Sequence, residues 1–327
     1  MIDLTSLIKS TKAYESVKTD MKEGRLSHAY LLLCADKENL DSYLKEFAKT
    51  IFCLEGKGCE KCRPCSLIEK GLFADVVFLP REGQIISAED ITALVQDTFV
   101  KPYEADKKLY LISHGETMNA TAQNKLLKTL EEPPKNVHII IGATNEHSLL
   151  PTIKSRVKKL EIPAFSNASL IDALKQECRD IQKLTNAVCI SDGTVGSALR
   201  YYNDDNISDC IEFCIDLLVN MQSSSQIIDY SDKLSKLKCD FLDVLTVLEL
   251  LVRDMLAMTC GKSDLAFNKT SLERLKSAKG FTQGSLIAVL ENLVGAKKRL
   301  EANSTKNMVA EWLLFKILEE KYKWQKL

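Results

Sequence analysis

Short apolar runs alternate with amphipathic helical patterns through the first half of the chain. Five runs have the length of buried strands: 29–34, 75–79, 109–113, 137–142 and 157–162. Between them, apolar residues recur at helical spacing in three segments: 37–52, 88–99 and 121–131. Strands that alternate with helices pack as a parallel sheet with helices on both faces. The first half therefore predicts an α/β domain of about 160 residues.

The strand patterns stop near residue 162, and the rest of the chain has the pattern of helices. The segment 162–169, IPAFSNAS, combines a proline with residues that favour helix N-caps. A short helical unit follows, and it ends in a polar linker, YYNDDNISD. Beyond the linker, apolar residues recur at helical spacing in four segments: 208–221, 240–259, 281–302 and 308–324. These observations predict three parts, a core at 1–165, a small helical unit at 166–205 and a helical domain at 206–327.

The composition is that of an ordinary soluble globular protein. Of the 327 residues, 45% are apolar and 27% are charged, and the formal net charge is −1. The chain is too long for one compact core, and its balanced charge gives no sign of free nucleic-acid binding. The N-terminus has no apolar signal segment, and charges interrupt even the densest apolar segment, 241–258. We therefore expect a cytoplasmic protein whose eleven cysteines are reduced.

Four of the cysteines form the sharpest local motif. In CLEGKGCEKCRPC, the residues Cys53, Cys59, Cys62 and Cys65 are spaced C-x5-C-x2-C-x2-C. Two intervening residues let one turn direct two thiolates at the same ion, and four thiolates complete the shell of structural zinc. Such a site leaves no position open for catalysis, so we expect it to fold an insertion at 53–65. Two alternatives are four unligated thiols and an iron–sulfur cluster, because C-x2-C-x2-C also occurs in ferredoxins.

The segment after the first predicted strand has the position of a phosphate-binding loop but not its residues. A P-loop uses glycines to wrap backbone N–H groups around phosphates, a lysine for the outer phosphates and Ser or Thr for magnesium. The segment CADKENLD has Cys34 and Asn39 in place of the glycines, Leu40 in place of the lysine and Asp41 in place of the hydroxyl residue. We therefore expect that no ATP binds or is hydrolysed in this pocket.

A second catalytic element is replaced as well. The predicted strand 109–113 ends in Ser113 and His114, where a P-loop ATPase carries the acidic pair that holds magnesium and activates water. His114 has no nucleophile or acid at a readable spacing, so we interpret it as a packed or solvated side chain. Two independent losses argue against ATP hydrolysis by this chain.

Five segments together resemble one family. They are SHAYLLL at the first strand, the four-cysteine insertion, PYEADKKLYLI, NKLLKTLEEPP and LLPTIKSRV. In this combination the chain resembles the delta-prime family of bacterial DNA polymerase III clamp-loader subunits, by motif over 1–205 and by length and helicity beyond. The resemblance implies an AAA+ core of the P-loop type with a zinc insertion. It further implies a small helical lid and an all-α collar domain that assembles a ring of subunits.

The resemblance also implies a function. The family works in a complex that opens the sliding clamp and places it on primed DNA, and its partners are gamma or tau ATPase subunits and delta. Because its members usually do not hydrolyse ATP, we expect no catalytic activity of the isolated chain, which would be part of a DNA polymerase holoenzyme. In GTVGSAL, Gly196 stands where the ATPase subunits carry a sensor-2 arginine. Thr144 and Asn145 fall at the sensor-1 position and are interpreted as structural, since they have no nucleotide to sense.

One functional residue of the family is matched in this chain. In KSRV, Ser155 and Arg156 match the family's SRC motif, while Val157 replaces the cysteine. The resemblance implies that Arg156 reaches into the ATP site of the neighbouring subunit, where such a cation raises the rate on the order of a thousandfold or more. From the local sequence alone, a solvated arginine at a helix end is the commoner interpretation. The change at Val157 bears only on the packing behind the arginine.

Two other functions fit parts of the sequence. An active gamma- or tau-type ATPase would share the core, but it needs the glycines, lysine and acids that the two loops replace. An independent zinc module that binds nucleic acid would share the cysteines, but it would bind DNA tightly as a monomer, against a net charge near zero. Nucleotide binding and DNA binding by the isolated chain separate these alternatives from the clamp-loader interpretation.

Overall fold

The chain divides into two units by its internal contacts. The computed structural model describes residues 4–80, 85–262, 269–302 and 304–323. The first unit comprises residues up to 181 and the segment 193–197, and the second comprises 182–192 and everything from 198 onward. Each unit has a hydrophobic core of its own. The division into three parts with boundaries at 165 and 205 stays a prediction.

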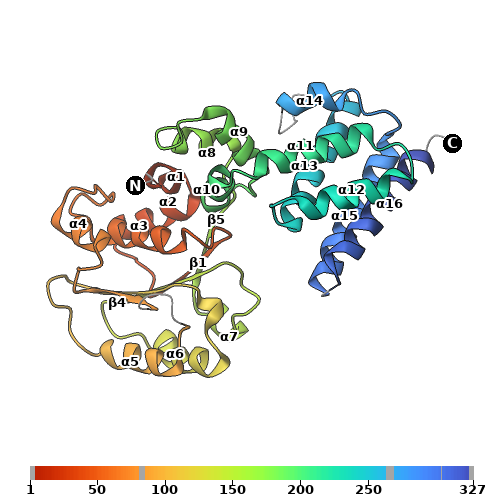
Figure 1. The fold of residues 1–327 in the computed structure, drawn as a ribbon. Coiled ribbons are helices and arrows are strands. Elements are labelled where there is room, and N and C mark those ends of the chain that lie inside the picture. Colours follow the sequence, from red (N-terminus) through yellow and green to blue (C-terminus); the bar gives the residue numbers. More distant parts are fainter. Residues whose placement is uncertain (1–3, 81–84, 263–268, 303, 324–327) are drawn as a thin grey trace. The chain divides into compact units, whose positions relative to one another are not determined.

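The first unit is built on a five-stranded parallel sheet (Figure 1). Its strands are β1 (Ala29–Cys34), β2 (Val76–Leu79), β3 (Lys108–Ile112), β4 (Val137–Ala143) and β5 (Lys158–Ile162). They lie in the order β2-β3-β4-β1-β5, and every neighbouring pair is parallel. The five predicted strands are confirmed to within one residue at each end, and the predicted α/β class is confirmed with them.

Helices cover both faces of this sheet, as the alternating pattern predicted. Figure 1 shows α2 and α3 on one face and α5, α6 and α7 on the other. Local sequence fixes where several of them begin, because Ser87 and Asp90 form a capping box at α5 and Asn119 caps α6. The helices are α1 (Thr5–Lys9), α2 (Lys12–Lys22), α3 (Leu40–Phe52), α4 (Arg63–Glu69), α5 (Ala88–Asp97), the 3₁₀ turn Gly115–Thr117, α6 (Ala120–Glu131), α7 (Pro151–Lys154) and α8 (Asn167–Leu174).

The core of the first unit lies between the sheet and the helices that cover it. Leu31, Tyr110 and Ile139 from three adjacent strands pack with Ala122 and Leu126 of α6, and all five are buried. Because the strands are parallel, the carboxyl ends of β1 and β3 meet at the same edge of the sheet. In open α/β sheets this edge is where ligand-binding loops gather, and here it brings the replaced phosphate loop next to Ser113.

The second unit is all helical. Its core is formed largely by α11, α13, α15 and α16. These are the four helices that the apolar pattern predicted. The helix α12 was not predicted, because it buries only Tyr230 fully and so has little apolar signal. Among the helices described, none combines the length and apolar character needed to cross a membrane. The helices are α9 (Ile181–Ile190), α10 (Val195–Asn203), α11 (Ile207–Asn220), α12 (Gln226–Lys236), α13 (Phe241–Thr259), α14 (Lys269–Leu275), α15 (Gln283–Glu301) and α16 (Lys306–Lys323).

Candidate functional site

The four cysteines of the motif converge between the end of α3 and the start of α4. Cys53 follows α3, Cys62 caps α4, and Cys65 lies in its first turn. The loop between the helices turns back on itself at Gly56 and Gly58, which have φ values of 64° and 61°. The four Sγ atoms all lie within 4.8 Å of one another, as four ligands of one ion must. The group can therefore hold a metal ion, and its chemistry fits zinc.

The protein environment differs from one cysteine to the next. Burial raises the pKa of Cys53, but hydrogen bonds from the backbone N–H groups of Lys57, Cys59 and Glu55 outweigh it and lower the pKa to about 6. At Cys65, which is fully buried, burial prevails and raises the pKa. Since the thiolate is the metal ligand, binding of an ion would release the proton of Cys65 to solvent, whereas the thiol of Cys53 ionises more readily.

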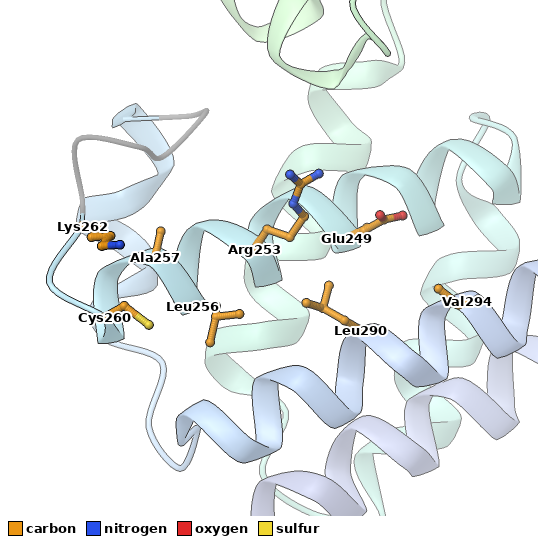
Figure 2. A pocket seen from close by; sticks show the side chains of 8 residues that line it. All are labelled: Glu249, Arg253, Leu256, Ala257, Cys260, Lys262, Leu290 and Val294. Atoms are coloured by element: carbon orange, nitrogen blue, oxygen red, sulfur yellow. The ribbon is translucent and has the colours of Figure 1, made fainter.

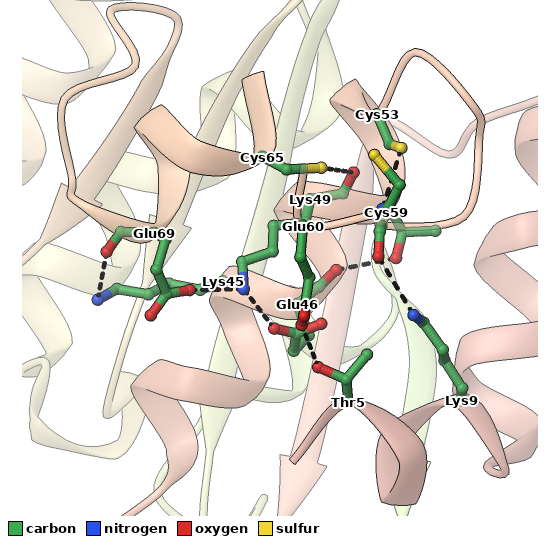
Figure 3. Close-up of polar contacts among 12 residues, drawn as sticks. Thr5, Lys9, Lys45, Glu46, Lys49, Cys53, Cys59, Glu60, Cys65 and Glu69 are labelled. Carbon is green, nitrogen blue, oxygen red and sulfur yellow. Dashed lines mark hydrogen bonds and ion pairs between the residues drawn. The ribbon is translucent and has the colours of Figure 1, made fainter. Parts of the chain in front are cut away.

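Side chains of the two N-terminal helices hold the cysteine loop in place, as Figure 3 shows for Thr5 and Lys9. Thr5 Oγ1 donates a hydrogen bond to Glu60 Oε1 at 2.5 Å, and Lys9 Nζ donates to the carbonyl of Gly58 at 3.2 Å. The hydroxyl of Tyr14 donates to the carbonyl of Lys57 at 3.0 Å. The loop is therefore docked on the first unit and does not stand free in solvent.

A buried lysine supports the cysteine group from the side of α3 (Figure 3). Lys49 is 5% exposed, and its Nζ lies 2.6 Å from Glu46 Oε1 and 2.5 Å from Glu69 Oε2. Burial raises the pKa of Glu46 even though Lys49 opposes it, whereas at Lys49 burial is outweighed by the two carboxylates and the pKa rises. Glu69 is the last residue of α4, and Glu46 and Lys49 lie in α3. The network therefore links α4, the helix that carries Cys65, to α3. The carbonyl of Lys49 is also 4.0 Å from Cys65 Sγ.

The residues that replace the ATPase machinery contact one another at the carboxyl edge of the sheet. Ser113 Oγ donates a hydrogen bond to Asp41. An ATPase of this kind would have an acid at the position of Ser113 and a hydroxyl residue at the position of Asp41, so the two types of side chain are exchanged here. His114 has left-handed backbone geometry with a φ of 52°, and its Nδ1 lies 3.5 Å from Glu116 Oε1. The same Glu116 oxygen accepts a hydrogen bond from Thr144 Oγ1 at 2.9 Å. Thr144 thus faces a carboxylate of its own chain.

A further contact at this edge was not predicted. Gly196, at the sensor-2 position, lies against the segment that replaces the phosphate loop, and its N–H donates to Asp36 Oδ2 at 3.2 Å. No signal in the sequence pointed to Lys49 as a partner of these sites. For Asp36 the available signal was an acidic residue inside a phosphate-loop position, from which no prediction was drawn.

Arg156 follows α7 and is held at the surface of the first unit. Its Nη2 lies 2.7 Å from Glu131 Oε1, and its Nη1 donates to the carbonyl of Thr152 at 2.9 Å and to Ser155 Oγ at 3.1 Å. Glu131 belongs to NKLLKTLEEPP, so two of the family-like segments meet in this ion pair. The side chains are 35% and 49% exposed, and exposed pairs of this kind contribute about 0–1 kcal/mol to stability.

The second unit carries an open groove between α13 and α15 (Figure 2). Its volume is about 440 Å³. Val294 is 48% exposed in its wall. The lining residues come mainly from α13 and α15 and are Glu249, Arg253, Leu256, Ala257, Cys260, Lys262, Leu290 and Val294.

A parallel sheet of this order, with helices on both faces, defines an open α/β core of the P-loop type, in which Ser113 and Asp41 are in contact at the carboxyl edge. Residues 9–166 match the family model described as DNA polymerase III, delta subunit. The DNA polymerase III subunit delta' of Bacillus subtilis is 30% identical over 325 residues, which cover 94% of each chain. The chain therefore belongs to the DNA polymerase III delta-prime family of clamp-loader-related subunits.

Other similar proteins include further DNA polymerase III subunits. The DNA polymerase III subunit tau/gamma of Haemophilus influenzae is 31% identical over 153 residues, which are 46% of this chain and 22% of that protein. Among solved structures, a DNA polymerase III gamma-subunit-related protein of Thermotoga maritima is 18% identical, with a TM-score of 0.41. That superposition covers 94% of this chain and 99% of the other.

Proposed function

We propose that the chain is a non-hydrolysing subunit of a DNA polymerase III clamp loader, which helps to place the sliding clamp on primed DNA. The observation that carries this proposal is the contact between Asp41 and Ser113, found in a member of the delta-prime family. Those two residues occupy the positions that hold magnesium in an ATPase of this fold. Here the hydroxyl of Ser113 donates its hydrogen bond to Asp41, so the two positions contact each other directly.

The pocket is also unsuited to a nucleotide in its charge and shape. Leu40 is fully buried where a lysine would reach the outer phosphates, so no cation is offered from this position. Asp36 and Asp41 add carboxylates to the same segment, and like charges near a phosphate are repulsive. The chain is therefore expected to keep the shape of an ATPase core without binding ATP there.

The proposed partners are ATPase subunits of the gamma or tau type and the delta subunit, with the sliding clamp and primed DNA engaged through the whole complex. The names of the similar proteins support this assignment. We place the contacts that assemble the ring on the second unit, as a collar. The open groove between α13 and α15, with Val294 and Leu290 in its wall, supports that placement, because exposed apolar grooves mark protein interfaces (Figure 2).

Arg156 is proposed to act in trans, as an arginine finger for the ATP site of a neighbouring subunit. Its guanidinium is engaged by Glu131 in this structure, but the pair is exposed, so exchanging Glu131 for a phosphate of the neighbour costs little. In the partner's site the planar guanidinium would stabilise the charge that develops on the transferred phosphoryl group. The chain would thus contribute to catalysis without an active site of its own.

The cysteine group is proposed to hold one structural zinc ion. Bound there, zinc would supply a tetrahedral centre that joins four points of the chain, with no catalytic step. Cys53, Cys59, Cys62 and Cys65 would be the ligands, supported by the docking of their loop on α1 and α2 and by the network around Lys49. Nucleotide is not expected as a cofactor of this chain.

Single-turnover ATP hydrolysis by the reconstituted complex tests the role of Arg156. Arg156→Ala should assemble normally but lose turnover at one ATP site, on the order of a thousandfold there. Arg156→Lys should rescue poorly, because an ammonium lacks the planar fork of a guanidinium. Lys159→Ala is the matched control, since it also removes an exposed cation, 3.0 Å from Glu146, and should leave hydrolysis unchanged. Wild-type hydrolysis by Arg156→Ala would reduce the proposed role to that of a scaffold.

A further inference from the structure

Asp36 is a buried carboxylate at the point where β1 leads into the replaced phosphate loop. It is 3% exposed, and most of its hydrogen bonds are accepted by Oδ2. Asn39 Nδ2 donates to both of its oxygens, at 3.0 Å and 3.1 Å, and the hydroxyl of Tyr43 donates to Oδ2 at 2.8 Å. Burial and the nearby Asp36 carboxylate raise the pKa of Tyr43, so its phenol stays protonated as a donor.

Two more donors reach Asp36 from a distant part of the chain. The backbone N–H groups of Val195 and Gly196 donate to Oδ2 at 3.0 Å and 3.2 Å. These residues begin α10, and the first N–H groups of a helix have no acceptor within the helix itself. The segment 193–197 groups with the first unit, so the contact lies within that unit. It joins residues 159 and 160 positions apart in the chain.

The approach between the two segments is close, and a larger residue than glycine would displace side chains there. A Cβ atom at Gly196 would lie 2.6 Å from Asp36 Oδ1 and 2.6 Å from Glu38 Oε2. A second glycine, Gly193, has a φ of 82°, and a Cβ there would lie 2.7 Å from the Cβ of Ala164. The carbonyl of Gly193 also accepts a hydrogen bond from the N–H of Phe165 at 2.8 Å. The start of α10 is therefore fitted to this surface by both of its glycines.

We propose that Asp36 is a built-in anion, which fills the anion-binding position at the start of α10 and latches the segment 193–197 onto the core without any nucleotide. A helix N-terminus attracts negative charge through its free N–H groups and its dipole, and phosphates are common occupants of such positions. In this chain the negative charge is attached covalently to the loop that would otherwise bind phosphate. The latch cannot be released by hydrolysis or by product dissociation, so this part of the subunit stays in one state throughout an ATPase cycle of its partners.

This inference concerns a contact within the chain and goes beyond the proposed role in the clamp loader. It can fail while the proposed function stands, because a chain that neither binds ATP nor latches this segment could still assemble. It can also hold for a chain that joins no complex. Its test therefore uses the purified full chain and measures the latch itself.

Hydrogen exchange at the amides of Val195 and Gly196 is the direct measurement. In the wild-type chain both amides should be protected, and Asp36→Ala should speed their exchange by about tenfold or more, since charge-assisted hydrogen bonds are lost. Glu38→Ala is the matched control, because it removes a neighbouring carboxylate and should leave both amides protected. Unchanged exchange at the two amides in a folded Asp36→Ala chain overturns the latch.

Two further measurements keep the proposal open to refutation. If Asp36→Ala does not fold, Asp36→Asn decides, because it keeps the shape of the side chain but removes its negative charge. Wild-type protection of Val195 and Gly196 in Asp36→Asn would contradict an anion at this position. Adding inorganic phosphate to Asp36→Ala should restore protection of the two amides if the position is one for an anion. If phosphate leaves them exchanging freely, Asp36 does not stand in for a phosphate and that part of the proposal is overturned.

Discussion

Replacing Lys49 with methionine would remove the only cation that the structure places between Glu46 and Glu69, and would leave a hydrophobic chain of similar length in its place. The side chains of Lys49 and Glu46 are 6% and 9% exposed, so water cannot take over the lost interaction. Glu69 is 40% exposed and can be solvated once it is released. The perturbation therefore falls mainly on Glu46, which becomes a buried carboxylate without its partner.

The magnitude follows from this difference in burial. Removing one partner of a buried ion pair costs about 3–5 kcal/mol, because an uncompensated charge remains, whereas losing an exposed pair such as the one with Glu69 costs about 0–1 kcal/mol. We expect Lys49→Met to lower the free energy of unfolding by about 3–5 kcal/mol, which is large against the typical 5–15 kcal/mol of a domain. Adding Glu46→Gln removes the stranded charge, so the double variant should recover most of the loss.

The loss in Lys49→Met should also depend on pH. The folded-state pKa of Glu46 is already raised from 4.5 by burial, and removing Lys49 takes away the contributions that oppose this rise. A carboxyl whose folded pKa is raised contributes stability below its unfolded pKa, and that stability is lost as the pH rises through the folded pKa. Relative to wild type, Lys49→Met should therefore be least destabilised near pH 4.5 and most destabilised at neutral pH and above.

Urea unfolding followed by circular dichroism, at pH 7 and at pH 5, measures these quantities. Lys45→Met is the control, since Lys45 lies on the same helix and donates only to the backbone carbonyl of Glu69 at 3.4 Å. That variant should stay within about 1 kcal/mol of wild type. If Lys49→Met also stays within about 1 kcal/mol at pH 7, the network around Lys49 does not support the cysteine-bearing helix as argued.

Metal analysis should find about one zinc per chain, lost in Cys65→Ser and retained in Cys260→Ser, whose thiol is exposed and outside the group; iron with labile sulfide would contradict zinc. Calorimetry with magnesium-ATP should give no heat of binding, because the buried Leu40 offers no charge to a phosphate; micromolar affinity would show the pocket to be functional. Val294→Asp should weaken assembly with gamma- or tau-type and delta subunits while the chain stays folded, since it places a charge in the apolar wall of the groove. Unchanged assembly would move the collar contact to another surface.

The inner strands were predictable because they are covered on both faces and so read as continuous apolar runs, whereas the edge strand β5 buries only Leu160 and Ile162. In β1, five of the six residues are buried, whereas three of the four in the edge strand β2 are only partly so. The first two helices escaped prediction, because α2 buries only Ala13, Tyr14 and Val17 in a stretch rich in charge. Helices of this kind depend on tertiary packing more than on local pattern.

The distinction between local pattern and tertiary packing also separates the predictable from the unpredictable contacts of the candidate site. The convergence of the cysteines was predictable, because two-residue spacings and glycine turns act within a few positions of the chain. The ion pairs of Lys49 with Glu46 and Glu69 involve groups on two helices, and only Glu46 is near it in sequence. The contact of Asp36 with the start of α10 joins residues 159 positions apart, and no local pattern specifies it. Contacts of this range follow from the order of the strands, which sets which loops share an edge.

If the chain does not hydrolyse ATP, as we propose, the contact between Asp41 and Ser113 makes that activity hard to gain by single substitutions. Restoring an acid at Ser113 while Asp41 remains would set two carboxylates in contact, and restoring a hydroxyl at Asp41 while Ser113 remains would leave no acid to hold a metal. Each of the two substitutions is thus disfavoured or useless until the other is present, so their effects are not additive. A magnesium site at this edge would need both changes together, because the hydrogen bond between Asp41 of α3 and Ser113 after β3 links the two positions.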